Sequence, residues 1–258
     1  MMKRDPDEAS NEAVDLDRLQ VEALRVYQRY VTEVVEALSL CPWAKRSRLS
    51  GRVRPLIVTE AAPTMERVMS YIDRIAEDGD IDIGLLIFPS IGPGAGPALA
   101  ARIGPGDMPP PPSLPGPWPD MGPVPFRRFV SAVREHDAAR HPVGATPLLM
   151  ADFHPFARID TGSPARLVSF IRRTPDPTIQ LVRHSVLSSV KRTENEGTMF
   201  ASAALLEQMV LNPPPEPLHQ RIAAANYDTI DAFGIARVAA ILDDIRTDRN
   251  QAYAGLIR

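Results

Sequence analysis

The sequence predicts an α/β fold, with α+β as the alternative, in which helices pack on a small mixed four-stranded sheet. Short runs of β-branched residues alternate with longer segments whose apolar residues recur at helical spacing. The connections between these runs are long enough for the crossovers that parallel strands need. With 258 residues, of which 44% are apolar and 24% charged, the chain can bury a substantial core.

The first half of the core contains two predicted helix and strand pairs. Apolar residues recur with a helical period over residues 16–39, which predicts one amphipathic helix. A strand rich in β-branched residues is expected over 53–59. The second helix is expected over 64–77, with Thr64 as its N-cap, and a buried central strand over 81–88.

Many of the 27 prolines crowd into a stretch from Pro89 to Pro125. Because proline lacks the backbone donor and fixes φ, this stretch predicts a long inserted loop. The later core elements are expected as a helix at 126–140, a strand at 147–153, a helix at 164–172, a strand at 178–182 and helices at 185–191 and 198–211.

One α/β core domain is predicted over residues 16–211, preceded by a disordered tail at 1–15. The inserted loop at 89–125 interrupts this core. A C-terminal helical extension is expected over 212–258, with helices at 218–226 and 229–247 and Asp228 as the cap of the second. The apolar face of that helix favours burial against the core and leaves a homo-oligomer through the C-terminal helices as the alternative.

Composition limits the classes of function. A net charge of -3 and a pI near 6.0 give no overall attraction to nucleic acid or to an anionic membrane. No apolar run approaches the roughly 18 residues that span a bilayer, and the polar start has no signal-peptide core. The single cysteine rules out an intrachain disulfide and fits a reducing compartment. We therefore expect a cytoplasmic protein without a membrane partner and with no nucleic acid as its partner.

The only cysteine, Cys41, is the first candidate for chemistry because it follows the first helix and precedes a basic run. A thiolate needs a lowered pKa, which Lys45 or an imidazolium can supply. His154 lies in a Phe-His-Pro segment after the predicted third strand. Cys41 and His154 are therefore predicted as a nucleophile or redox thiol and its proton shuttle, with Lys45 beside them.

Arginines flank the proline turn that leads into the predicted fourth strand. Arg172 and Arg173 precede that strand and Arg183 follows it. Two converging guanidinium groups, mainly those of Arg173 and Arg183, are expected to bind a carboxylate or phosphate bidentately. The site then favours an enzyme that acts on a small anionic molecule, with Arg173, Arg183 and Lys45 as its substrate-binding residues. The basic run from Lys45 to Arg54 has few aromatic residues to stack on bases, which favours a solvated loop over a nucleic-acid site.

Two alternatives of other classes stay open. Cys41, His154 and His184 could ligate a metal, and a Cys-Pro thiolate can also serve as an axial ligand of haem iron, although the spacing matches no standard zinc pattern. The third reading is a non-catalytic interaction module that works through the proline-rich stretch and the C-terminal helices.

Several segments, in order, resemble the bacterial domain-of-unknown-function family 1415. In that family a helix ends in Leu-Cys-Pro-Phe-Ala-Lys, which is similar to Leu40-Cys41-Pro42-Trp43-Ala44-Lys45. The segment from Ile83 to Pro89 resembles its second strand, Phe153-His154-Pro155 its Phe-His-Pro segment, and the run from Arg173 to Arg183 its Arg-Ser-Pro-x-Pro-Thr run. The resemblance covers about residues 20–210 and leaves out the inserted loop and the tail.

The resemblance implies an α/β fold and carries no established activity. Its matching positions are Cys41, Pro42, Lys45, His154, Pro155, Arg173, Pro175, Pro177 and Arg183. The sequence departs from the family pattern at three places. Gln180 stands where the family has a histidine, His184 where it has a glutamate, and Phe156-Ala157 where it has Asp-Tyr.

Overall fold

The computed structural model describes residues 15–60, 63–89, 122–142, 145–186 and 218–256. It has a four-stranded mixed sheet in the order β1-β2-β4-β3, which confirms the predicted α/β fold. The strands are β1 (Val53–Ile57), β2 (Ile83–Ile87), β3 (Leu148–Phe153) and β4 (Thr178–Arg183). β1 and β2 are parallel, and β4 is antiparallel to both of its neighbours.

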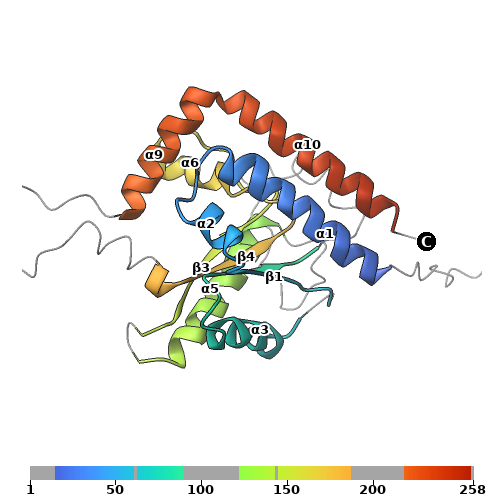
Figure 1. Cartoon of the computed structure of the whole chain (residues 1–258), viewed down its shortest axis with the longest axis vertical. Coiled ribbons are helices and arrows are strands. Elements are labelled where there is room, and N and C mark those ends of the chain that lie inside the picture. The colour runs from blue at the N-terminus through green and yellow to red at the C-terminus, as the bar shows by residue number, and fades with distance from the viewer. Residues whose placement is uncertain (1–14, 61–62, 90–121, 143–144, 187–217, 257–258) are drawn as a thin grey trace, which may run out of the picture.

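Helices cover both faces of this sheet (Figure 1). The helices are α1 (Leu16–Tyr30), the π-helix η1 (Val31–Glu36), α2 (Ala44–Leu49), α3 (Met65–Glu77), α5 (Pro123–Ala139), α6 (Pro164–Ile171), α9 (Leu218–Phe233) and α10 (Ile235–Ala254). Figure 1 shows α3 and α5 on one face and α1, α6, α9 and α10 on the other. Among the described residues, none of the helices combines the length and the apolar character needed to cross a membrane.

The face under α3 and α5 carries the first core layer, which includes Ile72, Ile75, Leu86, Phe126, Val130, Ile179 and Leu181. Gly84 in β2 lets α3 approach this face closely. A Cβ atom at Gly84 would lie 2.6 Å from Cδ1 of Ile75 and 3.2 Å from Cδ1 of Leu181. The glycine therefore serves as the contact surface for a helix, which is one of the uses of glycine within strands.

The opposite face carries the second core layer, which includes Tyr27, Tyr30, Val34, Leu40, Leu85, Phe170, Ile230, Val238, Leu242 and Ile245. It joins residues from both ends of the chain. α10 packs along α1, and α9 packs against α6. The predicted C-terminal extension therefore belongs to the main core, and the apolar face that suggested a homo-oligomer is buried within the chain.

The predicted strands are found at their expected places to within about two residues at each end. Pro55, in the middle of β1, is accommodated because β1 lies at the edge of the sheet. The backbone of Arg52 and Val58 faces β2, since Arg52 accepts from Asp82 N–H and Val58 donates to Ile87 O, each at 2.8 Å. Residues alternate along a strand, so the missing N–H of Pro55 faces away from β2.

The first helix differs from the prediction. Regular α-helix ends at Tyr30, and η1 continues it with wider hydrogen bonds, such as Leu40 N–H to Val35 O at 2.9 Å. Thr32 lies in η1 and donates its hydroxyl to Gln28 O at 2.9 Å, a back-bond that disturbs helical geometry. The segment then closes at Ser39, whose φ of 52° is left-handed.

Two further predictions were wrong: a short helix was missed, and the boundary between the last two helices was misplaced. The short helix α2 occupies residues that the sequence assigned to a solvated loop. The last two helices are separated at Gly234, whose φ is 100°, and not at Asp228, which lies inside α9. Glycine reaches this backbone conformation without a Cβ clash, so it breaks the helix more effectively than a potential cap does.

Some predictions lie outside the described residues. These are the disordered tail up to residue 14, the central part of the inserted loop at 90–121, most of the helix at 185–191 and the whole of the helix at 198–211. The other predicted helices, at 64–77, 126–140 and 164–172, are confirmed with small shifts at their ends. Thr64 is the N-cap of α3, where its side chain accepts from Arg67 N–H at 3.2 Å.

Candidate functional site

Two of the segments that carry predicted site residues meet at one end of the sheet. The end of β3 lies opposite the start of β4, with Phe153 paired to Thr178. Beyond β3, His154 N–H donates to Arg172 O at 3.1 Å. Arg173 Nε donates to Pro155 O at 3.0 Å. The Phe-His-Pro segment and the turn at Arg172 and Arg173 are therefore held together by their backbones.

Tyr30 connects this turn to the end of the first helix. Its buried hydroxyl donates to Ile171 O at 2.7 Å. Burial raises the pKa of Tyr30, Arg172 opposes this shift, and Cys41 adds to it. The phenol of Tyr30 therefore lies within electrostatic range of both Arg172 and Cys41.

Cys41 is partly buried in the second core layer, between Leu40 and Trp43, which both belong to that layer. Burial raises the pKa of the Cys41 thiol to about 11, although the backbone N–H groups of Trp43 and Ala44 partly oppose this. The thiol is therefore protonated near neutral pH, contrary to the activated thiolate that the sequence suggested. Lys45 is exposed on α2.

His154 belongs to the other side of the sheet. It is 3% exposed, and its ring centroid lies 5.7 Å from that of Phe126, a residue of the first core layer. Its Nδ1 accepts from Phe156 N–H at 3.1 Å. Cys41 and His154 thus pack in different layers, and the structure does not assemble the predicted pair of nucleophile and base.

Arg183 has a structural role. Its guanidinium donates to Ile81 O and Asp78 O at 2.8 Å, to Ile75 O at 2.9 Å and to Ala76 O at 3.3 Å. These carbonyls lie at and just beyond the end of α3, where helical acceptors are otherwise unsatisfied. Arg183 therefore caps α3.

The predicted clamp of Arg173 and Arg183 is wrong as a pair. The two arginines lie at opposite ends of β4, which contains 6 residues. A strand rises about 3.3 Å per residue, so about 20 Å of strand separates them. The two arginines are close in sequence because they flank one strand, which suggested a shared site. The extended backbone of that strand keeps them apart in space.

Arg172, the third arginine that flanks the proline turn, stacks on an aromatic ring. Its guanidinium carbon lies 5.2 Å from the ring centroid of Phe153. Among the described residues, no carboxylate forms an ion pair with it and no acceptor takes a hydrogen bond from it. Burial lowers the pKa of Arg172, while Asp152 partly offsets this and two arginines of α5, Arg127 and Arg134, add to it. The sequence placed Arg172 in the arginine group at this turn but assigned the clamp mainly to Arg173 and Arg183.

Arg173 lies in a cleft beside α10. A small cleft lies between the turn and α10, lined by Pro155, Arg173, Thr174, Pro175, Leu242, Asp243, Ile245 and Arg246. Burial lowers the pKa of Arg173, and the nearby charge of Arg246 lowers it further. Arg246 pairs with Asp243 at 2.9 Å. Two guanidinium groups and one carboxylate thus share this cleft.

The metal site predicted from Cys41, His154 and His184 is not assembled. His184 is exposed and donates its N–H to Pro147 O at 2.9 Å, at the start of β3. His154 follows the end of β3, so the whole strand separates the two imidazoles. Within the part of the chain that the structure describes, no group of three histidine, cysteine or acidic side chains is placed to hold a metal ion.

A buried polar network behind the turn was not predicted. Asp176, 1% exposed, accepts from Arg249 at 2.7 Å and from the Tyr253 hydroxyl at 2.6 Å. The hydroxyls of Thr174 and Thr178 both donate to Asp176 O, at 2.7 and 2.9 Å. The four-residue spacing of Arg249 and Tyr253 places them on one side of α10, but nothing local reveals their partner.

Two other regions do not contribute to the turn. A cleft of about 370 Å³ lies between β1 and the end of α3 and contains none of the predicted site residues. In the basic run, three of the four arginines pair with carboxylates: Arg48 with Glu36 at 2.6 Å, Arg52 with Asp82 at 3.0 Å and Arg54 with Asp78 at 3.3 Å. These ion pairs reduce the positive charge that this segment could offer to phosphate groups.

Comparisons of the chain with protein-family models, with curated proteins and with solved structures found no match. The resemblance to family 1415 therefore stays a prediction.

Proposed function

We propose that this protein binds a small anionic molecule through Arg172, at the end of the sheet where the turn before β4 meets Phe153 of β3. The observation that carries the proposal is the state of the Arg172 guanidinium. It is partly buried, burial lowers its pKa, and among the described residues it has a stacking partner in Phe153 but no ion pair. A charge that is largely withdrawn from water and lacks an ion pair is destabilised, and a bound anion supplies that pair.

The backbone around Arg172 is fixed from two sides. Tyr30 holds Ile171 O from the first helix, and His154 holds Arg172 O from the end of β3. Stacking on Phe153 further restricts the side chain. A guanidinium held in this way loses little conformational entropy when it binds, which favours affinity.

The electrostatic surroundings also favour an anion. Asp152 has the largest charge effect at Arg172 and favours its cation, while Arg127 and Arg134 act in the opposite direction with smaller effects. Asp152 is itself paired with Arg127 at 3.2 Å, which reduces its effect. Three guanidinium groups, those of Arg127, Arg134 and Arg172, thus share one carboxylate, and this excess of positive charge favours an anion.

The proposed activity is binding, without a covalent step. The high pKa of Cys41 keeps its thiol neutral, and a bound anion would raise that pKa further. His154 supports the Arg172 backbone and belongs to the other core layer. A cytoplasmic location and kinship with family 1415 complete the proposal, supported by the single cysteine and by the matching residues around Cys41, His154 and Arg173.

The test uses Cys41 as a reporter, because a single cysteine gives a single labelled product. Full-length protein is titrated with acetate, oxalate and inorganic phosphate at low ionic strength. The thermal midpoint and the rate of iodoacetamide labelling are measured for the wild type, for Arg172→Gln and for Arg172→Lys. Arg166→Gln is the matched control, since Arg166 lies on the preceding helix α6 with its side chain 67% exposed.

We expect at least one anion to raise the midpoint and slow the labelling of the wild type and of Arg166→Gln. Arg172→Gln should lose both effects, and Arg172→Lys should retain part of them because it keeps the charge without the planar fork. Equal responses of Arg172→Gln and the wild type, or no response of the wild type to any of the three anions, would refute the proposal.

A further inference from the structure

Arg172 and Arg173 are adjacent in sequence but face different parts of the molecule. Arg172 stacks on Phe153 and lies near Tyr30. Arg173 instead lines the cleft between the turn and α10, opposite Arg246. The cleft is thus a place in the fold separate from the surroundings of Arg172.

Positive charge is in excess in this cleft. Arg246 has Asp243 as its partner, with Nη2 and Oδ1 2.9 Å apart. Arg173 uses its Nε for Pro155 O, and no described residue accepts a hydrogen bond from its two terminal nitrogens. One carboxylate therefore faces two guanidinium groups, and their mutual repulsion is relieved by an added anion.

The size of the cleft limits what enters it. The space open to a water-sized group is about 10 Å³, which is about enough for one oxygen atom or water molecule. A tetrahedral oxyanion can place one oxygen in this space and keep the others outside, within reach of two guanidinium groups. Planar forks of this kind bind phosphoryl oxygens bidentately.

We infer that the cleft between the turn and α10 is a second anion-binding site, which takes a phosphoryl group between Arg173 and Arg246. Asp243 acts as a competing internal anion, since it occupies Arg246 when the site is empty. The site joins the turn before β4 to the C-terminal helix. It does not depend on the binding role proposed for Arg172.

The test is isothermal titration of full-length protein with inorganic phosphate at about pH 7 and low ionic strength. We expect Arg246→Gln to weaken binding roughly tenfold to hundredfold, the loss of a hydrogen bond to a charged group. Asp243→Asn should strengthen binding severalfold, because it removes the competing carboxylate. Arg237→Gln is the control, since Arg237 lies on the same helix and stacks on Phe233 away from the cleft.

The outcomes separate the two proposed sites. Retained phosphate binding in Arg172→Gln together with its loss in Arg246→Gln supports the cleft, whatever the fate of the Arg172 site. Loss in Arg172→Gln alone assigns the phosphate to the first site and overturns the cleft. Phosphate binding that is unchanged by both Arg246→Gln and Asp243→Asn, or an absence of binding to the wild type, also overturns it. Stronger phosphate binding by Asp243→Asn cannot arise from misfolding. This variant therefore distinguishes a loss of the site from a loss of the fold.

Discussion

At the scale of single residues, chemistry in this protein is decided by what surrounds each side chain. Cys41 has a basic run after it in sequence, yet burial dominates its titration. Arg183 and Arg173 resemble each other in sequence context, yet one caps a helix and the other lines a cleft. Residue type alone therefore indicated candidates, and their environments assigned different roles.

The reactivity of Cys41 follows from its pKa of about 11. Only the thiolate reacts with iodoacetamide, so the labelling rate should rise roughly tenfold for each pH unit from about pH 8 to about pH 10. No plateau is expected before about pH 11. Labelling kinetics followed by mass spectrometry measure this profile. A plateau near the pKa of an ordinary thiol, about 8.5, would contradict the effect of burial.

Gly84 should tolerate no side chain. Gly84→Ala places a methyl group 2.6 Å from Cδ1 of Ile75 and 2.9 Å from its Cγ2 in a packed core, so we expect a loss of about 1–3 kcal/mol in the free energy of unfolding. Gly79→Ala is the matched control, because no atom lies within 4 Å of its Cβ position. Urea denaturation compares the two variants. Equal stabilities would show that α3 does not approach β2 as closely as described.

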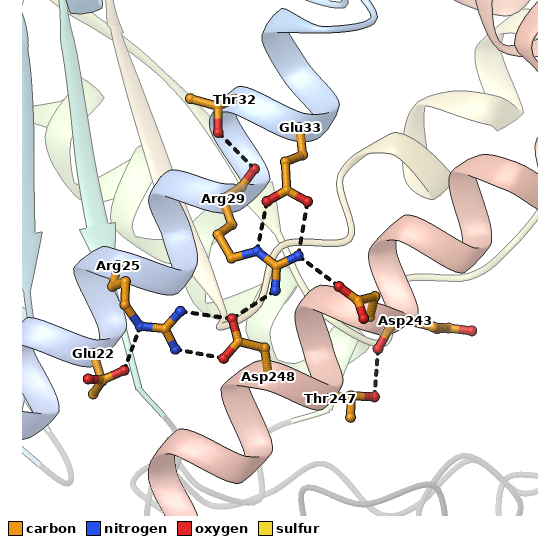
Figure 2. A network of polar contacts seen from close by, with 9 residues as sticks. Glu22, Arg25, Arg29, Thr32, Glu33, Asp243, Thr247 and Asp248 are labelled. Atoms are coloured by element: carbon orange, nitrogen blue, oxygen red, sulfur yellow. Dashed lines mark hydrogen bonds and ion pairs between the residues drawn. The ribbon is translucent and has the colours of Figure 1, made fainter.

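At the scale of elements, polar contacts join helices that the sequence places far apart. Figure 2 shows Arg25 and Arg29 of α1 reaching Asp248 of α10, with Glu22 and Glu33 on the α1 side. Arg25 forms two hydrogen bonds to Asp248, at 2.8 and 2.7 Å, and Arg29 adds one at 2.8 Å. These contacts align the first and the last described helices over the second core layer.

The acid sensitivity of this helix pair follows from Asp248. Hydrogen bonds from Arg25 hold the pKa of Asp248 well below its usual range, with a smaller contribution from Arg29. The stabilisation is present above the unfolded pKa, about 3.9, and is lost as the pH falls below that value. Because the groups are partly exposed, Asp248→Asn should cost about 1 kcal/mol or less at neutral pH and low salt.

Chemical denaturation at about pH 7 and about pH 3.5, with and without added salt, checks this prediction. The difference between Asp248→Asn and the wild type should shrink at the lower pH and at high ionic strength. Thr247→Ala is a suitable control on the same helix, since Thr247 donates only to Asp243 O. A difference that grows on acidification would be opposite in sign to the expected effect.

At the scale of the whole molecule, α10 packs against the turn that precedes β4 and holds it in place. Arg249 and Tyr253 reach Asp176, which lies between the turn and β4, and this ion pair is almost fully buried. α10 also supplies Arg246 to the cleft. The C-terminal helix thus contributes both to the stability of the fold and to the proposed second site.

Loss of Arg249 should therefore be strongly destabilising. Arg249→Met leaves the carboxylate of Asp176 buried without its cation, and we expect a loss of about 3–5 kcal/mol in the free energy of unfolding. The double variant Asp176→Asn with Arg249→Met should recover part of the loss, because no unpaired charge remains. Guanidinium denaturation measures both. A double variant less stable than Arg249→Met alone would show that the pair is not the source of the loss.

The alternation of helical and strand patterns predicted the four strands and the main helices before and between them. The errors arose where the backbone conformation departs from what the hydrophobic pattern or the residue type suggests. Apolar periodicity continues through residues 31–36, but a π-helix replaces regular helix there. Aspartate is a common helix cap, which suggested Asp228, but α9 ends just before Gly234, whose φ of 100° only glycine adopts readily. Such choices depend on backbone conformation, which a hydrophobic pattern does not encode.

The site was predicted in part. Sequence motifs placed His154, Pro155 and Arg173 together, and the structure brings these segments into contact. The stacking of Arg172 on Phe153, the position of Arg246 and the buried partner of Asp176 were not predictable. Each depends on an element distant in sequence, since α1 and α10 both pack around the turn.

The sequence by itself determined the fold class, the order of the strands along the chain and the identity of the polar motifs, because these follow from local periodicity and residue chemistry. Only the tertiary structure decided which motifs meet, on which face of the sheet Cys41 and His154 lie, and which arginines face a cleft. The physical reason is that burial and long-range pairing set the charge state and the partners of a side chain. Both arise only when distant segments pack against one another.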